Sequence, residues 1–209
     1  MFRPEAFFHT VALPYEWVTR HPVWESHCAK MATLLPEGAR RVLDLGCGPG
    51  NSTVHLRDAA GAGVIGADSA IAMLRRAHRR DPALRLLAAD AGRLPVRTGS
   101  LDAVTFHSVL YLLPDRAAAL REVVRVLRPG GRAVLLEPKD GARATFFGLM
   151  NALPQPGWAL TAALWRTVSK AYGRFTAASL RTCLEEAGFS NVRIETALGG
   201  LALLAVAEK

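Results

Sequence analysis

Short apolar runs alternate with longer segments whose apolar residues recur at helical spacing, and this pattern covers most of the chain. A buried strand of a parallel sheet reads as a short apolar run, whereas an amphipathic helix repeats its apolar residues every three or four positions. The runs predict strands at 41–45, 64–67, 85–89, 103–106 and 133–137. The helical spacing predicts helices from Pro22 to about 35, from 51 to about 60, from 70 to about 80 and from 114 to about 127. This alternation predicts a parallel sheet of the α/β class.

The C-terminal part ends the alternation with two strands in succession. Thr176 is placed to cap a helix at 177–187, because its side chain can accept a bond from a free backbone N–H group. Strands are predicted at 192–196 and 201–207, with Gly199-Gly200 as the hairpin turn between them. We therefore expect a doubly wound, mostly parallel sheet of seven strands, with helices on both faces.

The first predicted strand leads into a glycine-rich loop with the sequence Val42-Leu43-Asp44-Leu45-Gly46-Cys47-Gly48-Pro49-Gly50. Alternate glycines let the backbone come close to a ligand, and the free N–H groups of the helix that opens at Asn51 favour an anion or carboxylate. The spacing differs from the dinucleotide fingerprint, and the loop lacks the lysine of a P-loop. Asp44, two residues before the first glycine, suits a ligand that also carries a positive group.

Three successive strands are predicted to lead into a carboxylate: Asp44, Asp68 and Asp90. In a parallel sheet these strand ends meet at one edge, where the ligands of open α/β sheets bind. An acid at the end of the second strand can accept two hydrogen bonds from a ribose diol. Asp90 is placed to meet an adenine amino group, with the backbone N–H of Ala91 beside it. Acids also cap helices after strands, so each of them alone has a structural explanation.

The nonapeptide from Val42 to Gly50 resembles the first motif of the class I S-adenosylmethionine (SAM) methyltransferases. Leu94-Pro95 with Ser100–Val104 before the fourth strand, and Val126–Gly131 before the fifth, extend the resemblance from about Arg41 to Lys139. It points to small-molecule methyltransferases of the quinone-biosynthesis type. It implies the strand order 3-2-1-4-5-7-6, with the seventh strand antiparallel. Members often have a His-His pair after the fourth strand, where this chain has Tyr111-Leu112, and this departure puts their acceptor chemistry in doubt here.

The resemblance implies SAM as the cofactor and S-adenosylhomocysteine as its product. The residues implied at the methionyl part are Asp44, Gly46 and Gly48. Asp68 is implied at the ribose, and Asp90 with Ala91 at the adenine. The implied cofactor site is completed by Cys47, Gly50, Ser69 and Met73, and by the backbone at His107, which approaches the methionyl amino group.

Methyl transfer depends more on aligning the acceptor with the S–CH₃ bond than on a catalytic triad. A hydroxyl or acidic-carbon acceptor also needs a base, and His107 is the first candidate because its reference pKa lies near neutrality. Tyr111 and Glu137 are weaker candidates, and the alternative for His107 is a side chain that only shapes the pocket. The candidate acceptor contacts are Tyr15, Trp17, Glu137, Trp165 and Tyr172. Packing in the core explains the aromatic residues among them equally well.

The length allows one domain with a sizeable core, and we divide residues 1–209 of this single methyltransferase domain into four parts. These parts are an N-terminal helical flap at 1–38, a SAM-binding core at 39–139, an acceptor lid insertion at 140–175, and a terminal helix and hairpin at 176–209. Residues 144–165 carry no charge, but Pro154-Gln155-Pro156-Gly157 interrupts them, which favours two short helices over a membrane span. A lid, core helices and a membrane contact remain alternatives for this segment.

The net charge of +8 raises the question of a nucleic acid or an anionic membrane as partner. The basic residues are spread out, and the densest group, Arg75–Arg80, is expected on the outer face and end of a helix. Phe106–Val109 stands where amino-methylating nucleic-acid enzymes have Asn/Asp-Pro-Pro-aromatic, so a nucleic-acid partner is not expected. Peripheral contact with an anionic membrane stays an alternative.

The three cysteines, Cys28, Cys47 and Cys183, form no CxxC pair, and the histidines show no metal-ligand spacing with them. We therefore expect no metal site and a reducing, cytoplasmic location, and the N-terminus lacks the apolar core of a signal peptide. The expected function is methyl transfer from SAM to a small lipophilic or amphipathic acceptor, such as a quinone precursor, a lipid head group or a natural product. The alternatives are a nucleic-acid or protein methyltransferase and a non-catalytic SAM-binding protein.

Overall fold

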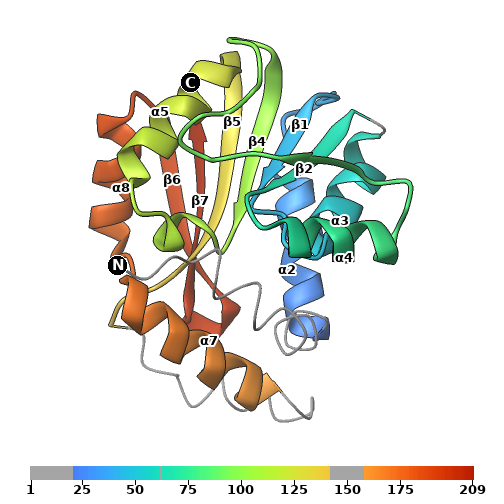
Figure 1. The fold of residues 1–209 in the computed structure, drawn as a ribbon. Helices are drawn as coiled ribbons and strands as arrows, with labels where there is room; N and C mark the ends of the chain where they lie inside the picture. Colours follow the sequence, from blue (N-terminus) through green and yellow to red (C-terminus); the bar gives the residue numbers. More distant parts are fainter. Residues whose placement is uncertain (1–20, 62, 142–157) are drawn as a thin grey trace.

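The sheet has seven strands in the order β3-β2-β1-β4-β5-β7-β6, in a computed structural model that describes residues 21–61, 63–141 and 158–209 (Figure 1). The strands are β1 (Val42–Leu45), β2 (Val64–Asp68), β3 (Arg85–Ala88), β4 (Leu101–His107), β5 (Leu127–Pro138), β6 (Ser190–Ala197) and β7 (Ala202–Glu208). Strands β1 to β5 pair in parallel, whereas β7 lies antiparallel between β5 and β6. The predicted fold class and strand order are confirmed.

Helices cover both faces of the sheet (Figure 1). The helices α5 (Arg116–Val126) and α8 (Ala177–Glu186) pack on one face, in the apolar cluster that contains Leu135 of β5. The helix α2 (Pro22–Thr33) packs on the other face with Val134 and Leu136, and α3 (Asn51–Ala60) packs on that face against β1 and β2. Neighbouring residues of β5 thus point to opposite layers, as the alternation of side chains along a strand requires.

Two further helices lie toward the carboxyl ends of the parallel strands. The helix α4 (Ile71–Arg80) begins directly after β2, and α7 (Trp158–Tyr172) contacts the end of β4 through Trp165. α7 begins directly after the predicted break at 154–157, and the other helix predicted for this segment lies outside the described residues. In the part of the chain that the structure describes, no helix is both long and apolar enough to cross a membrane. The division into flap, core, lid insertion and hairpin stays a prediction.

The main difference from the predicted elements is the start of β5. The sequence predicts a turn at 128–131 and a strand from 133, whereas β5 begins at Leu127 and pairs there with Leu101. The register then shifts before Ala103 pairs with Arg132, and Gly130 has a φ of 71°, which glycine adopts readily. The turn residues therefore form an irregularity within β5 instead of a loop before it.

Candidate active site at the carboxyl end of the sheet

The glycine loop between β1 and α3 is held against the end of β2. The N–H groups of Gly46 and Cys47 both donate to the carbonyl oxygen of Ala67, at 2.7 and 3.0 Å. The N–H of Gly48 donates to the carboxylate of Asp68 at 2.9 Å. The loop also follows β1 directly, and β1 pairs with β4 on its other side. The winding of the sheet reverses between β1 and β4, and ligands of doubly wound folds bind at such a point.

Two glycines of the loop stand where a side chain would be strained and crowded. Gly46 has a φ of 72°, and a Cβ atom there would lie 2.4 Å from Cγ2 of Val109. Gly50 directly precedes α3 with a φ of 84°, and a Cβ atom there would lie 2.9 Å from Cδ1 of Leu84. The absence of side chains lets the loop backbone lie close to Val109 and Leu84, and its predicted close approach to a ligand stays a prediction.

Asp44 lies beneath the loop, inside the protein. Its side chain is fully buried, and its carboxylate accepts hydrogen bonds from the hydroxyl groups of Ser52, Thr53 and Thr105 at 2.7, 2.6 and 2.9 Å. Burial raises the pKa of this carboxyl group, and the three hydroxyl donors oppose the shift. Asp44 therefore fastens the first turn of α3 to β1 and β4, and its predicted contact with a cofactor stays a prediction.

Asp68 ends β2 and links the glycine loop to α4. One carboxylate oxygen accepts the N–H of Gly48, and the other accepts the N–H of Ala70 at 2.8 Å. Burial raises the pKa of this carboxyl group, although backbone donors oppose the shift. Of the other residues predicted here, Ser69 is exposed directly beside Asp68, and Met73 is buried in the first turn of α4.

Asp90 and Ala91 follow β3, which pairs in parallel with β2. The N–H of Ala89 donates to the carbonyl oxygen of Asp68 at 3.2 Å, so this segment continues the sheet edge beside Asp68. The Asp90 side chain is exposed and accepts the N–H of Gly92 at 2.8 Å, while Ala91 is buried. The structure thus brings Asp68 and Asp90 to neighbouring strand ends, and their contacts with a nucleoside stay a prediction.

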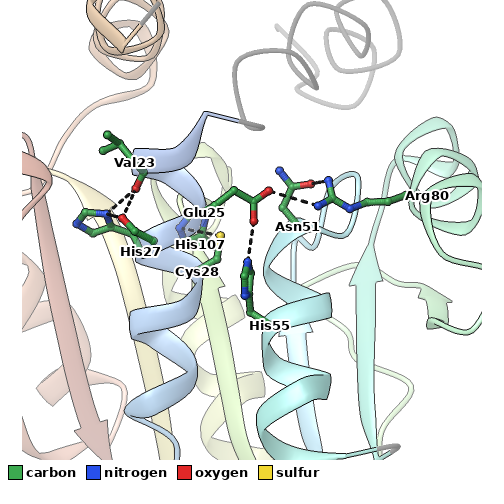
Figure 2. Close-up of polar contacts among 9 residues, drawn as sticks. Val23, Glu25, His27, Cys28, Asn51, His55, Arg80 and His107 are labelled. Atoms are coloured by element: carbon green, nitrogen blue, oxygen red, sulfur yellow. Dashed lines mark hydrogen bonds and ion pairs between the residues drawn. The ribbon is translucent and has the colours of Figure 1, made fainter. Parts of the chain in front are cut away.

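His107 ends β4 and is enclosed by side chains of α2. The ring of Trp24 lies edge-on to the imidazole with 4.8 Å between centroids, and Sγ of Cys28 lies 3.7 Å from its Nε2 (Figure 2). Only 7% of His107 is exposed, and burial, together with His27 and His55, lowers its pKa to about 3. The side chain is therefore neutral at physiological pH but a weak proton acceptor. This favours the alternative that His107 shapes the pocket, and its role as a base stays a prediction.

α7 reaches the same place through Trp165. The indole N–H donates to the hydroxyl of Ser108 at 2.7 Å, and the indole lies edge-on to Trp24 with 5.6 Å between centroids. Ser108 has a φ of 65°, which is uncommon for a residue with a side chain. Residues with such backbone conformations are often found at functional sites. Trp24, His107 and Trp165 are all buried and form a cluster at the end of β4, which we call the aromatic wall.

Glu137 on β5 anchors the 3₁₀ turn η1 (Leu110–Leu112) that follows β4. Its fully buried carboxylate accepts the backbone N–H groups of Val109, Leu110 and Tyr111 at 2.8–3.1 Å. Burial raises the pKa of Glu137 to about 7, against the effect of these three donors. The contacts give Glu137 a structural role, and its predicted roles as a base and acceptor contact stay predictions.

Tyr111 and Tyr172 bring η1 against α7. Their rings lie 6.3 Å apart and nearly perpendicular, and the guanidinium of Arg116 donates to the carbonyl oxygens of both residues at 2.9 and 2.8 Å. Their predicted catalytic and acceptor roles stay untested. The other two predicted acceptor contacts, Tyr15 and Trp17, lie outside the described residues.

Sequence reasoning missed Trp24, Cys28 and Ser108 as members of the site. Trp24 and Cys28 lie four residues apart on α2 and read as the apolar face of an ordinary helix, and nothing in that spacing shows which strand end the face meets. The strained backbone of Ser108 has no sequence signal either. Within residues 21–61, 63–141 and 158–209, no group of three or more His, Cys, Asp or Glu side chains is arranged to hold a metal ion.

Comparison with known proteins supports the same interpretation. Residues 43–135 match a family model described as a methyltransferase domain. A demethylmenaquinone methyltransferase of Mycobacterium sp. (strain KMS) is 38% identical over 177 residues, which cover 81% of this chain and 76% of the relative. A protein of the same name from Thermus thermophilus is 36% identical over 203 residues, which cover 89% of each chain.

Among solved structures, a SAM-dependent methyltransferase from Thermotoga maritima has a TM-score of 0.71 at 20% identity, over 98% of this chain and 99% of that one. This likeness shows a shared fold. Because the similarity to the two sequence relatives extends over most of the chain, the protein belongs to the class I family of SAM-dependent methyltransferases.

Proposed function

We propose that the protein transfers a methyl group from SAM to a small lipophilic acceptor of the quinone-precursor type. The observation that carries the proposal is the glycine loop at the carboxyl end of the sheet, with the Gly48 N–H bonded to the carboxylate of Asp68. The lipophilic acceptor is supported by the relatives named demethylmenaquinone methyltransferases. It is further supported by the aromatic wall, a cluster at the end of β4 two residues before Val109, whose side chain faces Gly46 of the loop.

The chemistry of the loop and strand ends fits the groups of SAM. The backbone N–H groups of the loop and of the first turn of α3 suit the methionyl carboxylate. Asp68 can accept from a ribose diol, and such donors stabilise a carboxylate whose pKa burial has raised. Asp90 suits the adenine amino group, with the N–H of Ala91 beside it. We assign supporting contacts to the neighbours of these residues: Cys47, Gly50, Ser69 and Met73.

The residues around the aromatic wall align the acceptor and exclude water. When bound, SAM supplies a methyl group on a positively charged sulfur, which is reactive enough that alignment decides the rate. Alignment of this kind contributes up to roughly 7–11 kcal/mol. Because burial lowers the pKa of His107 to about 3, its imidazole stays neutral and places no positive charge beside the sulfonium. Trp24 and Cys28 of α2 contact the imidazole, and Trp165 packs against Trp24.

Replacing Asp68 by asparagine tests the cofactor site. The variant removes a charged acceptor, and hydrogen bonds to charged groups contribute about 1.5–3 kcal/mol, so we expect the affinity for S-adenosylhomocysteine to fall about tenfold or more. Isothermal titration calorimetry measures this affinity. Asp58→Asn is the matched control, because Asp58 is an exposed carboxylate on α3 paired with Arg57. An Asp68→Asn variant that binds as tightly as the unaltered protein would refute the assignment.

A radiolabelled-methyl assay tests the acceptor. We expect transfer from SAM to a demethylated isoprenoid quinol and no transfer to a polar amine of similar head-group size. Transfer to the amine alone would refute the lipophilic acceptor while leaving the cofactor site intact.

We further propose a cytoplasmic protein that contacts an anionic membrane peripherally through α4. The outward face of α4 carries Ile71, Arg75, His78 and Arg79 at helical spacing, all exposed. An apolar residue among basic side chains suits an anionic bilayer surface. Sedimentation with vesicles that contain phosphatidylglycerol should carry the protein down, and Arg75→Glu with Arg79→Glu should abolish this. Equal sedimentation with neutral phosphatidylcholine vesicles would contradict the role of charge.

A further inference from the structure

A chain of polar side chains joins α2 to α3 and α4, and the proposed reaction does not use it. The carboxylate of Glu25 on α2 lies 2.6 Å from Nε2 of His55 and 3.3 Å from the guanidinium of Arg80. Arg80 also donates to the side-chain oxygen of Asn51. Figure 2 shows Glu25 extending from α2 toward these residues. We call Glu25, Asn51, His55 and Arg80 the α2 latch.

The latch contacts the proposed cofactor site through Asn51. Asn51 is the first residue of α3, it directly follows Gly50 of the glycine loop, and it is 4% exposed. Arg80, which holds its side chain, ends α4, the helix that begins after Asp68. The groups that hold Glu25 are thus connected both to the glycine loop and to the helix that follows Asp68.

Glu25 also fixes the rotation of α2 about its axis. Consecutive residues of a helix point about 100° apart, so Trp24 meets His107 while Glu25 beside it meets α3 and α4. His27 fixes another side, because its Nε2 accepts the backbone N–H of Leu198 at 3.2 Å. Glu25 and His27 thus hold the first turns of α2 in the orientation that places Trp24 against His107.

We propose that Glu25 is a positioning residue that couples the cofactor loop to the aromatic wall. Through Arg80 and Asn51, Glu25 responds to the position of the first turn of α3. Through α2, Glu25 holds Trp24 against His107. A bound cofactor then completes the wall beside the reacting methyl group. The inference rests on the proposed binding of SAM at the glycine loop. Coupling between two sites is reciprocal, so a cofactor that settles the loop also stabilises α2.

Amide hydrogen exchange with and without S-adenosylhomocysteine tests this coupling. In the unaltered protein we expect the ligand to slow exchange in the loop at 46–50 and also in α2, there by about fivefold or more. In Glu25→Gln, which keeps the shape of the side chain and removes its charge, the slowing should persist in the loop and disappear from α2. Arg80→Gln breaks the same link from α4 and should give the same result.

Lys30→Gln is the matched control, because Lys30 lies in the last turn of α2 and forms an exposed ion pair with Glu195 of β6. In this variant the ligand should still slow exchange in α2. Two results would overturn the proposal. In the first, the ligand slows exchange in the loop of the unaltered protein but not in α2. In the second, the ligand slows exchange in α2 equally in the unaltered protein and in Glu25→Gln. Should Glu25→Gln fail to fold, the unaltered protein and Arg80→Gln decide the question. An unprotected loop would instead refute the proposed cofactor site, and this inference with it.

Discussion

At the scale of single residues, the site depends on backbone shape as much as on side chains. Gly46 and Gly38 have nearly the same φ, 72° and 70°, but their surroundings differ. A Cβ atom at Gly46 would lie 2.4 Å from Cγ2 of Val109, whereas a Cβ atom at Gly38 would meet nothing within 4 Å. The two positions therefore separate the strain of a positive φ from the lack of room.

Gly46→Ala is expected to destabilise the protein more than Gly38→Ala. Both variants carry the strain of a positive φ, about 1 kcal/mol, and Gly46→Ala adds about 1–3 kcal/mol for overpacking against Val109. Urea unfolding measures the difference, and calorimetry should show weaker binding of S-adenosylhomocysteine to Gly46→Ala alone. Adding Val109→Ala should restore part of the lost stability. Equal destabilisation by the two alanines would show that crowding at Gly46 is unimportant.

The sequence predicts the loop, Asp68 and Asp90 because glycine spacing and acids at strand ends are local signals. It also predicts Asp44 as a ligand-facing acid, which stays a prediction, but it does not predict the three hydroxyl groups that bond to that carboxylate. Two of these groups come from α3, and the third comes from Thr105, 61 positions along the chain. Such a meeting depends on the packed fold and has no local signal.

At the scale of elements, the end of β4 is where several segments meet. η1 is tied to β5 because its backbone N–H groups donate to the side-chain carboxylate of Glu137, and it is tied to α7 by the guanidinium of Arg116. α2 contacts His107 through Trp24, and α7 contacts Trp24 and Ser108 through Trp165. The sequence predicts α2 from its helical spacing, but the partners of its apolar face follow only from the tertiary structure.

Glu137→Gln is expected to remove a pH dependence of stability. Burial raises the pKa of Glu137 from 4.5 to about 7, so between these values the folded protein keeps a proton that the unfolded chain has released. The stability from this group is fully present below pH 4.5 and is lost as pH rises through 7. The unaltered protein should therefore lose up to about 3 kcal/mol relative to the variant across this range. Urea unfolding at pH 5 and pH 8 measures the change, and a constant difference between the two proteins would contradict it.

At the scale of the whole molecule, one end of the sheet forms the site and the other end holds the strands together. At the far end, the carboxylate of Asp102 accepts the backbone N–H groups of Arg40 and Arg41 and the guanidinium of Arg128. Burial alone would raise the pKa of Asp102, but these donors, together with the Arg41 side chain, hold it well below its usual range. Stability and cofactor binding should therefore be separable.

Asp102→Asn is expected to lower the free energy of unfolding by about 2 kcal/mol and to leave the affinity for S-adenosylhomocysteine unchanged. Because the folded-state pKa is lowered, the advantage of the unaltered protein is present above about pH 3.9 and is lost as pH falls below that value. Thermal unfolding at pH 7 and pH 3 checks the stability, and calorimetry checks the affinity. A loss of affinity as large as that of Asp68→Asn would contradict the separation.

The sequence predicts more of the fold than of the candidate site. Alternating strands and helices predict the α/β class, and the resemblance of residues 41–139 to a known family supplies the strand order. The α2 latch could not be predicted, because Glu25, His55 and Arg80 lie far apart in the sequence and read as ordinary surface residues of three helices.

The most direct test of the account is a crystal structure of the protein with bound S-adenosylhomocysteine. We expect the ribose hydroxyls to donate to the carboxylate of Asp68, the adenine to lie beside Asp90 and Ala91, and the sulfur to face the aromatic wall. Density for the ligand elsewhere on the molecule, or a ribose turned away from Asp68, would contradict the account.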